Sequence, residues 1–85
     1  MHADHKKVGR YINVAKGQLE GIIKMIEEDK YCLDVSNQIL AAMAMLKKAN
    51  HEIISAHLRH CVVNAKGEES TEKLDEIIAL LKRIE

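Results

Sequence analysis

The chain has 85 residues with 13 basic and 13 acidic side chains, so its zero formal net charge does not single out a nucleic-acid partner. Hydrophobic residues make up 47% of it but aromatic residues only 2%, which suits helices packed on other helices and favours an oligomer. No segment resembles a signal peptide or a membrane span, so we expect a cytoplasmic protein with no membrane partner.

The N-terminal part combines a short arm with an amphipathic helix. Residues 1–5 are expected to form a mobile arm that holds His2. Gly17 and Gly21 lie within the helix and suggest close approach by another helix. Residues 1–16 carry a net charge of about +3, which makes this end the better candidate for an anionic partner. The helix is predicted from apolar residues that recur every three or four positions: Val8, Tyr11, Ile12, Ala15, Leu19, Ile22, Ile23 and Ile26.

A long helix is predicted from about residue 32 to 64, because apolar residues keep the helical spacing and no proline or glycine interrupts it. Gly67 is a plausible stop after it. A third amphipathic helix follows and completes a single all-α domain over residues 1–85. Its apolar stripe consists of Leu74, Ile77, Ile78, Leu81 and Ile84.

The only two cysteines, Cys32 and Cys61, lie at the two ends of the long helix. At about 1.5 Å per residue, roughly 43 Å of helix separates them, whereas a disulfide needs Cα atoms about 4.4–6.8 Å apart. They can meet if a second copy packs antiparallel about a two-fold axis, which creates two equivalent sites.

His57 precedes Cys61 by four residues and therefore shares its helix face. Two sulfurs and an imidazole suit a soft or borderline metal ion. A buried cysteine is also often a plain small hydrophobic residue, so the spacing alone leaves both roles open.

The segment GQLEGIIKMIEEDKYCLDVSNQILAAMAML, followed by HLRHCV, resembles the copper-sensitive operon repressor (CsoR) family of bacterial metal-sensing repressors. The similarity extends over about residues 10–84. It implies a three-helix protomer, an antiparallel four-helix-bundle dimer and a homotetramer of two dimers. The implied function is repression of metal-efflux genes through operator DNA, which is released when metal binds. We do not expect an enzyme, because the sequence has no acid–base pair beyond charged surface and no phosphate-binding loop.

The resemblance also implies a Cu(I) site made of Cys32 from one protomer with His57 and Cys61 from the other. Tyr31 and Glu76 match the outer shell that family members link to the histidine ligand. Such a link is physically sound, since a metal-bound imidazole offers its second N–H to an acceptor.

DNA contacts in the family come from basic residues of the first two helices, and Lys16 and Lys48 fall at such positions. Tyr11 stands where an arginine is usual, and its neighbour Arg10 is the candidate to replace it. The departure at Tyr11 also gives some support to a different function, a copper buffer that does not bind DNA.

Other branches of the family leave the inducer open. Nickel and cobalt sensors add an N-terminal histidine, and His2 lies near that place. With His60 beside Cys61, a four-ligand Ni(II) or Zn(II) site is an alternative to Cu(I). A persulfide-sensing branch uses its two cysteines, and the presence of His57 argues mildly against it.

Overall fold

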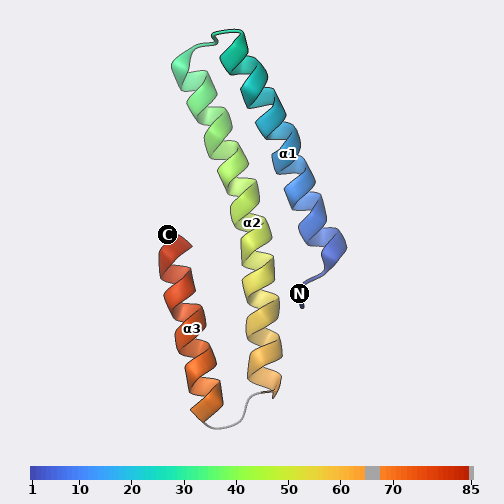
Figure 1. The fold of residues 1–85 in the computed structure, drawn as a ribbon, viewed down its shortest axis with the longest axis vertical. Helices are drawn as coiled ribbons and strands as arrows, with labels where there is room; N and C mark the ends of the chain where they lie inside the picture. Colours follow the sequence, from blue (N-terminus) through green and yellow to red (C-terminus); the bar gives the residue numbers. More distant parts are fainter. Residues whose placement is uncertain (65–67, 85) are drawn as a thin grey trace.

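The computed structural model describes residues 1–64 and 68–84, which form three helices: α1 (His5–Glu27), α2 (Cys32–Asn64) and α3 (Glu68–Ile84). The predicted all-α class is confirmed, and α2 has the predicted bounds. Gly67, the expected stop, lies outside the described residues. In Figure 1, α1 and α2 form a long antiparallel hairpin, and α3 returns along the C-terminal half of α2 on the side away from α1.

The start of α1 differs from the predicted arm over residues 1–5. Asp4 caps the helix, because its Oδ1 accepts hydrogen bonds from the backbone N–H groups of Lys6 at 2.9 Å and Lys7 at 3.4 Å. His5 is consequently the first residue of α1. Ala3 is only 7% exposed and packs with Val8. Residues 1–4 therefore include one buried side chain, that of Ala3. Apolar periodicity along a helix does not reveal it, because Ala3 lies before the helix begins.

A seam of small and branched side chains holds α1 against α2. On α1, the buried residues Val8, Ala15 and Ile22 follow one another at intervals of seven. On α2, Ala42 and Ala49 are also seven residues apart and are almost fully buried. Alanine removes side-chain bulk from the seam, so the two helices pack closely along one stripe each.

One ion pair joins the two helices beside this seam. Lys7 Nζ lies 3.0 Å from Glu52 Oε1. The hydrogen bond and the negative charge of Glu52 raise the pKa of Lys7 above its ordinary value. Because the folded-state pKa of Lys7 is the higher one, its contribution to stability is fully present at neutral pH and is lost as the pH rises through that pKa in strongly alkaline solution. The positive charge of Lys7 is thus paired with a carboxylate of the same chain.

The three helices lie side by side in a thin, elongated layer. The radius of gyration is 17.0 Å, whereas a compact domain of this length has about 12 Å. The shortest dimension is 12 Å, about the diameter of one helix. A Cβ built on Gly17 or Gly21 meets no atom of the described chain within 4 Å, so the helix expected close to them is not α2.

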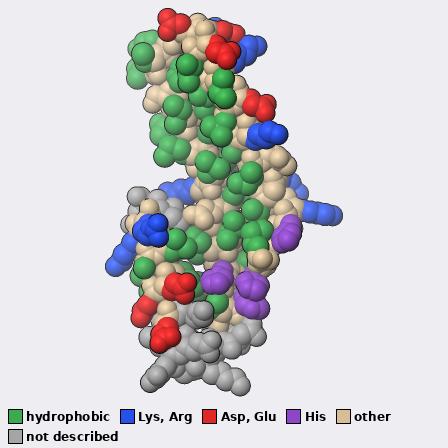
Figure 2. Space-filling view, in the orientation of Figure 1, with side chains coloured by type: hydrophobic (Ala, Val, Ile, Leu, Met, Phe, Trp, Pro, Cys, Tyr) green, Lys and Arg blue, Asp and Glu red, His purple; other side chains and the backbone are tan. Residues whose placement is uncertain are grey.

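This layer leaves much apolar surface uncovered. Figure 2 shows hydrophobic side chains along one face of the α1–α2 pair. No helix among the described residues has the length and apolar character needed to cross a membrane. The exposed hydrophobic residues on α1 and α2 are Ile12, Val14, Leu19, Ile23, Ile26, Leu33, Ile39, Leu40, Met43 and Leu46.

The cap at Asp4 gives a direct test of how α1 begins. Asp4→Ala removes the acceptor for two N–H groups of the first turn and should destabilise the protein by about 1 kcal/mol. The midpoint of thermal unfolding, followed by circular dichroism at fixed protein concentration, should fall by about 4–8 °C. Asp4→Asn keeps the acceptor and should stay close to the unsubstituted protein. Equal losses in both variants would contradict the cap.

Candidate functional site

One end of α2 brings an imidazole and a thiol together. His57 and Cys61 are one helical turn apart, and both are half-buried. Cys61 Sγ lies 3.4 Å from His57 Nε2, within hydrogen-bonding distance for sulfur. The spacing of four residues along a regular helix produces this contact without any loop. Two of the three predicted metal ligands are therefore adjacent in one chain.

The N-terminal residues add a second imidazole pair beside this one. The ring of His2 stacks on that of His60 with centroids 3.6 Å apart, and its centroid lies 5.9 Å from that of His57. Loss of hydration, followed by the charges of His60, the N-terminus and His57, lowers the pKa of His2. A lowered pKa favours the neutral imidazole, the form that binds metals.

Cys32 lies at the opposite end of α2. It is the first residue of the helix, its side chain is exposed, and roughly 43 Å of helix separates it from Cys61. Tyr31 accompanies it: the Tyr31 carbonyl accepts the first N–H bonds of the helix, and the residue is 65% exposed. Within the described residues of one chain, no three His, Cys, Asp or Glu side chains form a group suited to a metal ion.

The two thiols and His57 nevertheless share one face of α2. They belong to a row whose members are separated by three, four, seven or eleven residues, each close to a whole number of helical turns, which places them on a single stripe. Its apolar members are 42–57% exposed, so the stripe is uncovered over the N-terminal half of α2, whereas His57 and Cys61 near its other end are half-buried. The row consists of Cys32, Ile39, Met43, Leu46, His57 and Cys61.

Glu76 is brought near His57 by α3. Both residues line a cavity of about 370 Å³ between α2 and α3, together with Ile77 and Leu80. A second cavity of about 410 Å³, mostly apolar, lies next to it and is lined by Met1, His2 and His57 among others. The predicted outer-shell pair is thus divided in one chain: Glu76 lies at the His57 end and Tyr31 at the Cys32 end.

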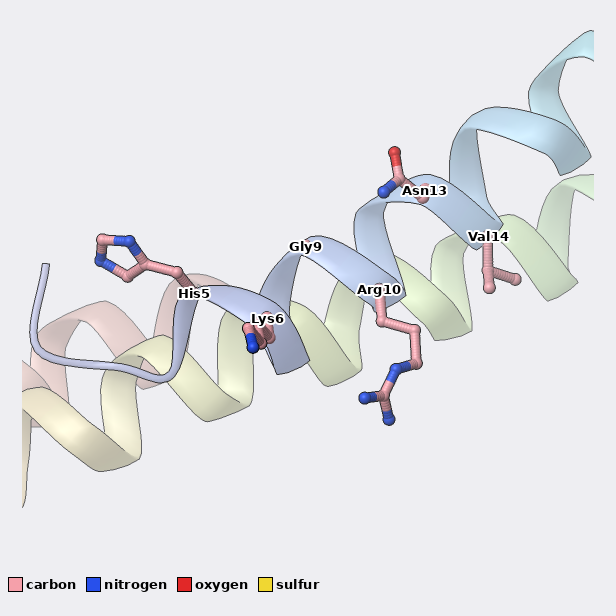
Figure 3. Close-up of a pocket in the computed structure, with 6 residues that line it drawn as sticks. All are labelled: His5, Lys6, Gly9, Arg10, Asn13 and Val14. Carbon is pink, nitrogen blue, oxygen red and sulfur yellow. The ribbon is translucent and has the colours of Figure 1, made fainter.

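The predicted DNA-contacting side chains are all exposed. Arg10 and Lys16 lie on α1, and Lys48 lies on α2. Tyr11 is half-buried and packs against the cluster of Ala3, Val8 and Ala49. Arg10 instead lines a shallow groove on the outer side of α1 (Figure 3). Of these two neighbours, Arg10 is therefore the one turned toward solvent.

Lys6 entered the sequence analysis only through the net positive charge of residues 1–16, and Asn13 was not singled out, although both line this groove together with His5. A signal was present, because no acidic residue occurs between Asp4 and Glu20. Such a gap is unusual at the start of a helix, where negative side chains are favoured by the helix dipole.

A family model for metal-sensitive transcriptional repressors matches residues 4–83 of the chain. The chain belongs to this family. The resemblance seen in the sequence is thereby confirmed.

Three relatives of this chain are named as copper-sensing transcriptional repressors. RicR of Mycobacterium tuberculosis (strain ATCC 25618 / H37Rv) is 47% identical over 53 residues, which cover 62% of this chain and 55% of RicR. CsoR of Mycobacterium ulcerans (strain Agy99) is 36% identical over 75 residues, or 84% of this chain and 62% of that protein. CsoR of Bacillus subtilis (strain 168) is 31% identical over 86 residues, or 96% and 85%. The chain thus spans only 55–62% of the two mycobacterial relatives.

The separation of the thiols predicts the product of oxidation. Mild oxidation should join Cys32 and Cys61 between chains and give a covalent dimer on a non-reducing gel, because one chain cannot bridge them. Peptide mapping should recover the mixed Cys32–Cys61 linkage. Cys32→Ser and Cys61→Ser, each with one thiol left, serve as controls and should form far less of the dimer. A monomer with an internal disulfide would contradict the straight α2.

Proposed function

We propose that this protein is a Cu(I)-responsive repressor in the cytoplasm that binds operator DNA and releases it when copper is bound. The observation that carries the proposal is the placement of Cys32, His57 and Cys61 on one uncovered apolar stripe of α2. The family assignment and the names of the three relatives support the same function. The proposal has three parts: a dimer, a shared metal site and a DNA surface.

The dimer forms when this stripe of α2 packs antiparallel on that of a second copy. Pairing Cys32 with Cys61 of the second copy places the two-fold axis beside Leu46, halfway between them. Exposed Ile12, Leu19 and Ile23 on α1 can extend the same apolar contact into a four-helix bundle. The exposed residues then supply the second layer of core that the thin single chain lacks.

The metal ligands in this dimer are Cys32 of one copy with His57 and Cys61 of the other. Thiolates and imidazole match the preference of Cu(I) for soft donors. The proximity of His57 Nε2 and Cys61 Sγ, 3.4 Å apart, supports their role as two of the three ligands. Glu76 lines the same cavity as His57 and would accept the remaining N–H of that imidazole, and Tyr31 of the second copy would arrive with Cys32.

Coupling to DNA follows from the position of Glu76 on α3. A hydrogen bond from His57 to Glu76 would tie the ligand set to a helix that otherwise packs only on α2 among the described residues. DNA affinity then depends on whether the site is filled. Linkage requires the converse as well, so operator binding must lower copper affinity by the same factor. We assign DNA contacts to Arg10, Lys16 and Lys48 in a tetramer of two dimers.

The dimer contact is tested by a charge at the two-fold axis. Leu46→Glu places two like charges close together in an apolar contact and should shift the protein toward monomer in sedimentation experiments at micromolar concentration. Leu40→Glu is the matched control, since Leu40 is also exposed on α2 but lies on another face. It should retain the dimer. Dissociation by Leu40→Glu alone would place the dimer contact on the wrong face.

The function itself is tested by a DNA mobility-shift assay with the upstream region of the chain's own gene. The apo protein should bind, and one equivalent of Cu(I) per chain should weaken binding at least 5-fold, at the lower end of coupling energies of about 1–3 kcal/mol. Cys61→Ala should bind DNA equally well but lose the copper response. Tight copper binding with no DNA binding would instead favour the buffer.

His2 and His60 favour one alternative inducer. Their stacked rings lie next to His57, so this end of the molecule offers more imidazoles than a Cu(I) site uses. A Ni(II) or Zn(II) sensor would recruit His2 or His60 as additional ligands. Substituting His2 by Ala distinguishes the two, because it should leave a Cu(I) response intact but weaken a Ni(II) or Zn(II) response.

A further inference from the structure

The residues that precede α1 lie against the end of α2 that carries His57 and Cys61. Met1 and His2 line the apolar cavity of about 410 Å³ together with His57. Both are exposed, Met1 by 64%, whereas His57 and Cys61 are half-buried. We propose that Met1 and His2 form an entry site, which takes up Cu(I) from a donor molecule and passes it to the proposed ligands on α2. The inference rests on the proposed function and concerns how the same metal site is filled.

Packing holds this segment in place beside the proposed ligands. Ala3 is only 7% exposed and packs in a cluster with Val8 and Ala49. Its neighbour His2 stacks on His60, with ring centroids 3.6 Å apart. Figure 2 shows histidine side chains gathered on the face that also carries the exposed hydrophobic residues. The segment is therefore held next to the site by contacts that do not depend on a metal ion.

The order of the donor groups suits a stepwise transfer. From solvent inward, Met1 offers a thioether, His2 an imidazole and Cys61 a thiol. Thioether and thiolate sulfur are both soft donors that select Cu(I), but only the thiolate adds a negative charge. A site from which an ion must leave again has to bind it weakly. The weaker donors lie outside and the strongest donor lies inside, as such a transfer requires.

The distances allow the ion to move without leaving the protein. The centroid of the His2 ring lies 5.9 Å from that of His57, and His57 Nε2 lies 3.4 Å from Cys61 Sγ. A metal–nitrogen bond is about 2.0–2.1 Å long, so small movements of the rings bring both imidazoles within reach of one ion. Transfer within the chain then proceeds at an effective concentration on the order of millimolar, far above that of a dilute donor.

The transfer is an exchange of ligands without oxidation or reduction. Met1 Sδ and a ring nitrogen of His2 form bonds to Cu(I) as its bonds to the donor, a small thiolate or a nitrogen chelator, break. His57 and Cys61 then replace them on the ion. The Cys61 thiol releases one proton as its sulfur binds, and the freed donor or the buffer takes up that proton.

The test measures how fast the apo protein takes Cu(I) from the coloured chelator bicinchoninate, by stopped-flow absorbance without oxygen and without DNA. His2→Ala should slow uptake by about 10-fold at micromolar protein, because the step within the chain is lost. Removal of Cu(I) by excess chelator should slow by the same factor. An entry site changes both rates and leaves their ratio, the Kd, unchanged. Equilibrium titration of the variant should therefore give the affinity of the unsubstituted protein.

Two further variants test the anchor and the outer sulfur. Ala3→Glu places a carboxylate at a buried apolar position and should detach the segment from α2. It should slow uptake as much as His2→Ala does, although both donor side chains remain. Met1→Leu keeps a side chain of similar size but removes the sulfur, and it should also slow uptake. Its reference is the unsubstituted chain with the same short leader before residue 1.

His5→Ala is the matched control. It removes an exposed imidazole close to His2 in the sequence, but Figure 3 shows His5 among the residues that line the groove on the outer side of α1. Both rates and the affinity should stay unchanged. Circular dichroism and sedimentation of each variant confirm that fold and assembly are kept.

Three outcomes would overturn the inference. Equal rates in His2→Ala and the unsubstituted protein, with tight Cu(I) binding intact, reject the entry site but leave the proposed function standing. Weaker affinity with faster removal in His2→Ala shows that His2 is a permanent ligand and not an entry site. Failure of the unsubstituted protein to bind Cu(I) tightly rejects the proposed function together with the entry site.

Discussion

The unbroken backbone of α2 is the constraint on which the other features depend. A helix of 33 residues holds the two thiols of one chain roughly 43 Å apart, and no side-chain movement can close that distance. Chemistry that needs both Cys32 and Cys61 must therefore take place between chains. Since His57 lies beside Cys61, each end of the helix carries a different part of the proposed ligand set. In the proposed site, metal binding therefore requires the assembly of two chains.

The thin shape of the single chain also favours the proposed assembly of two chains, because it leaves apolar surface exposed. Alanines such as Ala42 and Ala49 let α1 and α2 approach closely, but the hairpin buries only one stripe of each helix. Part of the remaining apolar surface, formed by Ile39, Met43 and Leu46, lies on the same face of α2 as the thiols. Burying this surface, at about 25 cal/mol per Å², would stabilise the proposed dimer contact.

Much of this fold could be predicted from the sequence, and the reasons are local. The bounds of α2 follow from helical periodicity without proline or glycine, and the His57–Cys61 contact follows from their spacing. The burial of Ala3 could not be predicted, because it depends on Ala49, far away in the chain. Asn13 was not singled out because periodicity reports buried faces, whereas this residue is exposed and lines a groove.

The composition of the copper site is the most direct test of a site shared between two chains. X-ray absorption at the copper edge, on protein loaded with one Cu(I) per chain, counts the sulfur ligands around each ion. Two sulfurs and one nitrogen are expected, because two thiolates at one ion require two chains. A single sulfur with several nitrogens would show that one chain binds the metal by itself, through Cys61 and the neighbouring histidines, and would contradict the shared site.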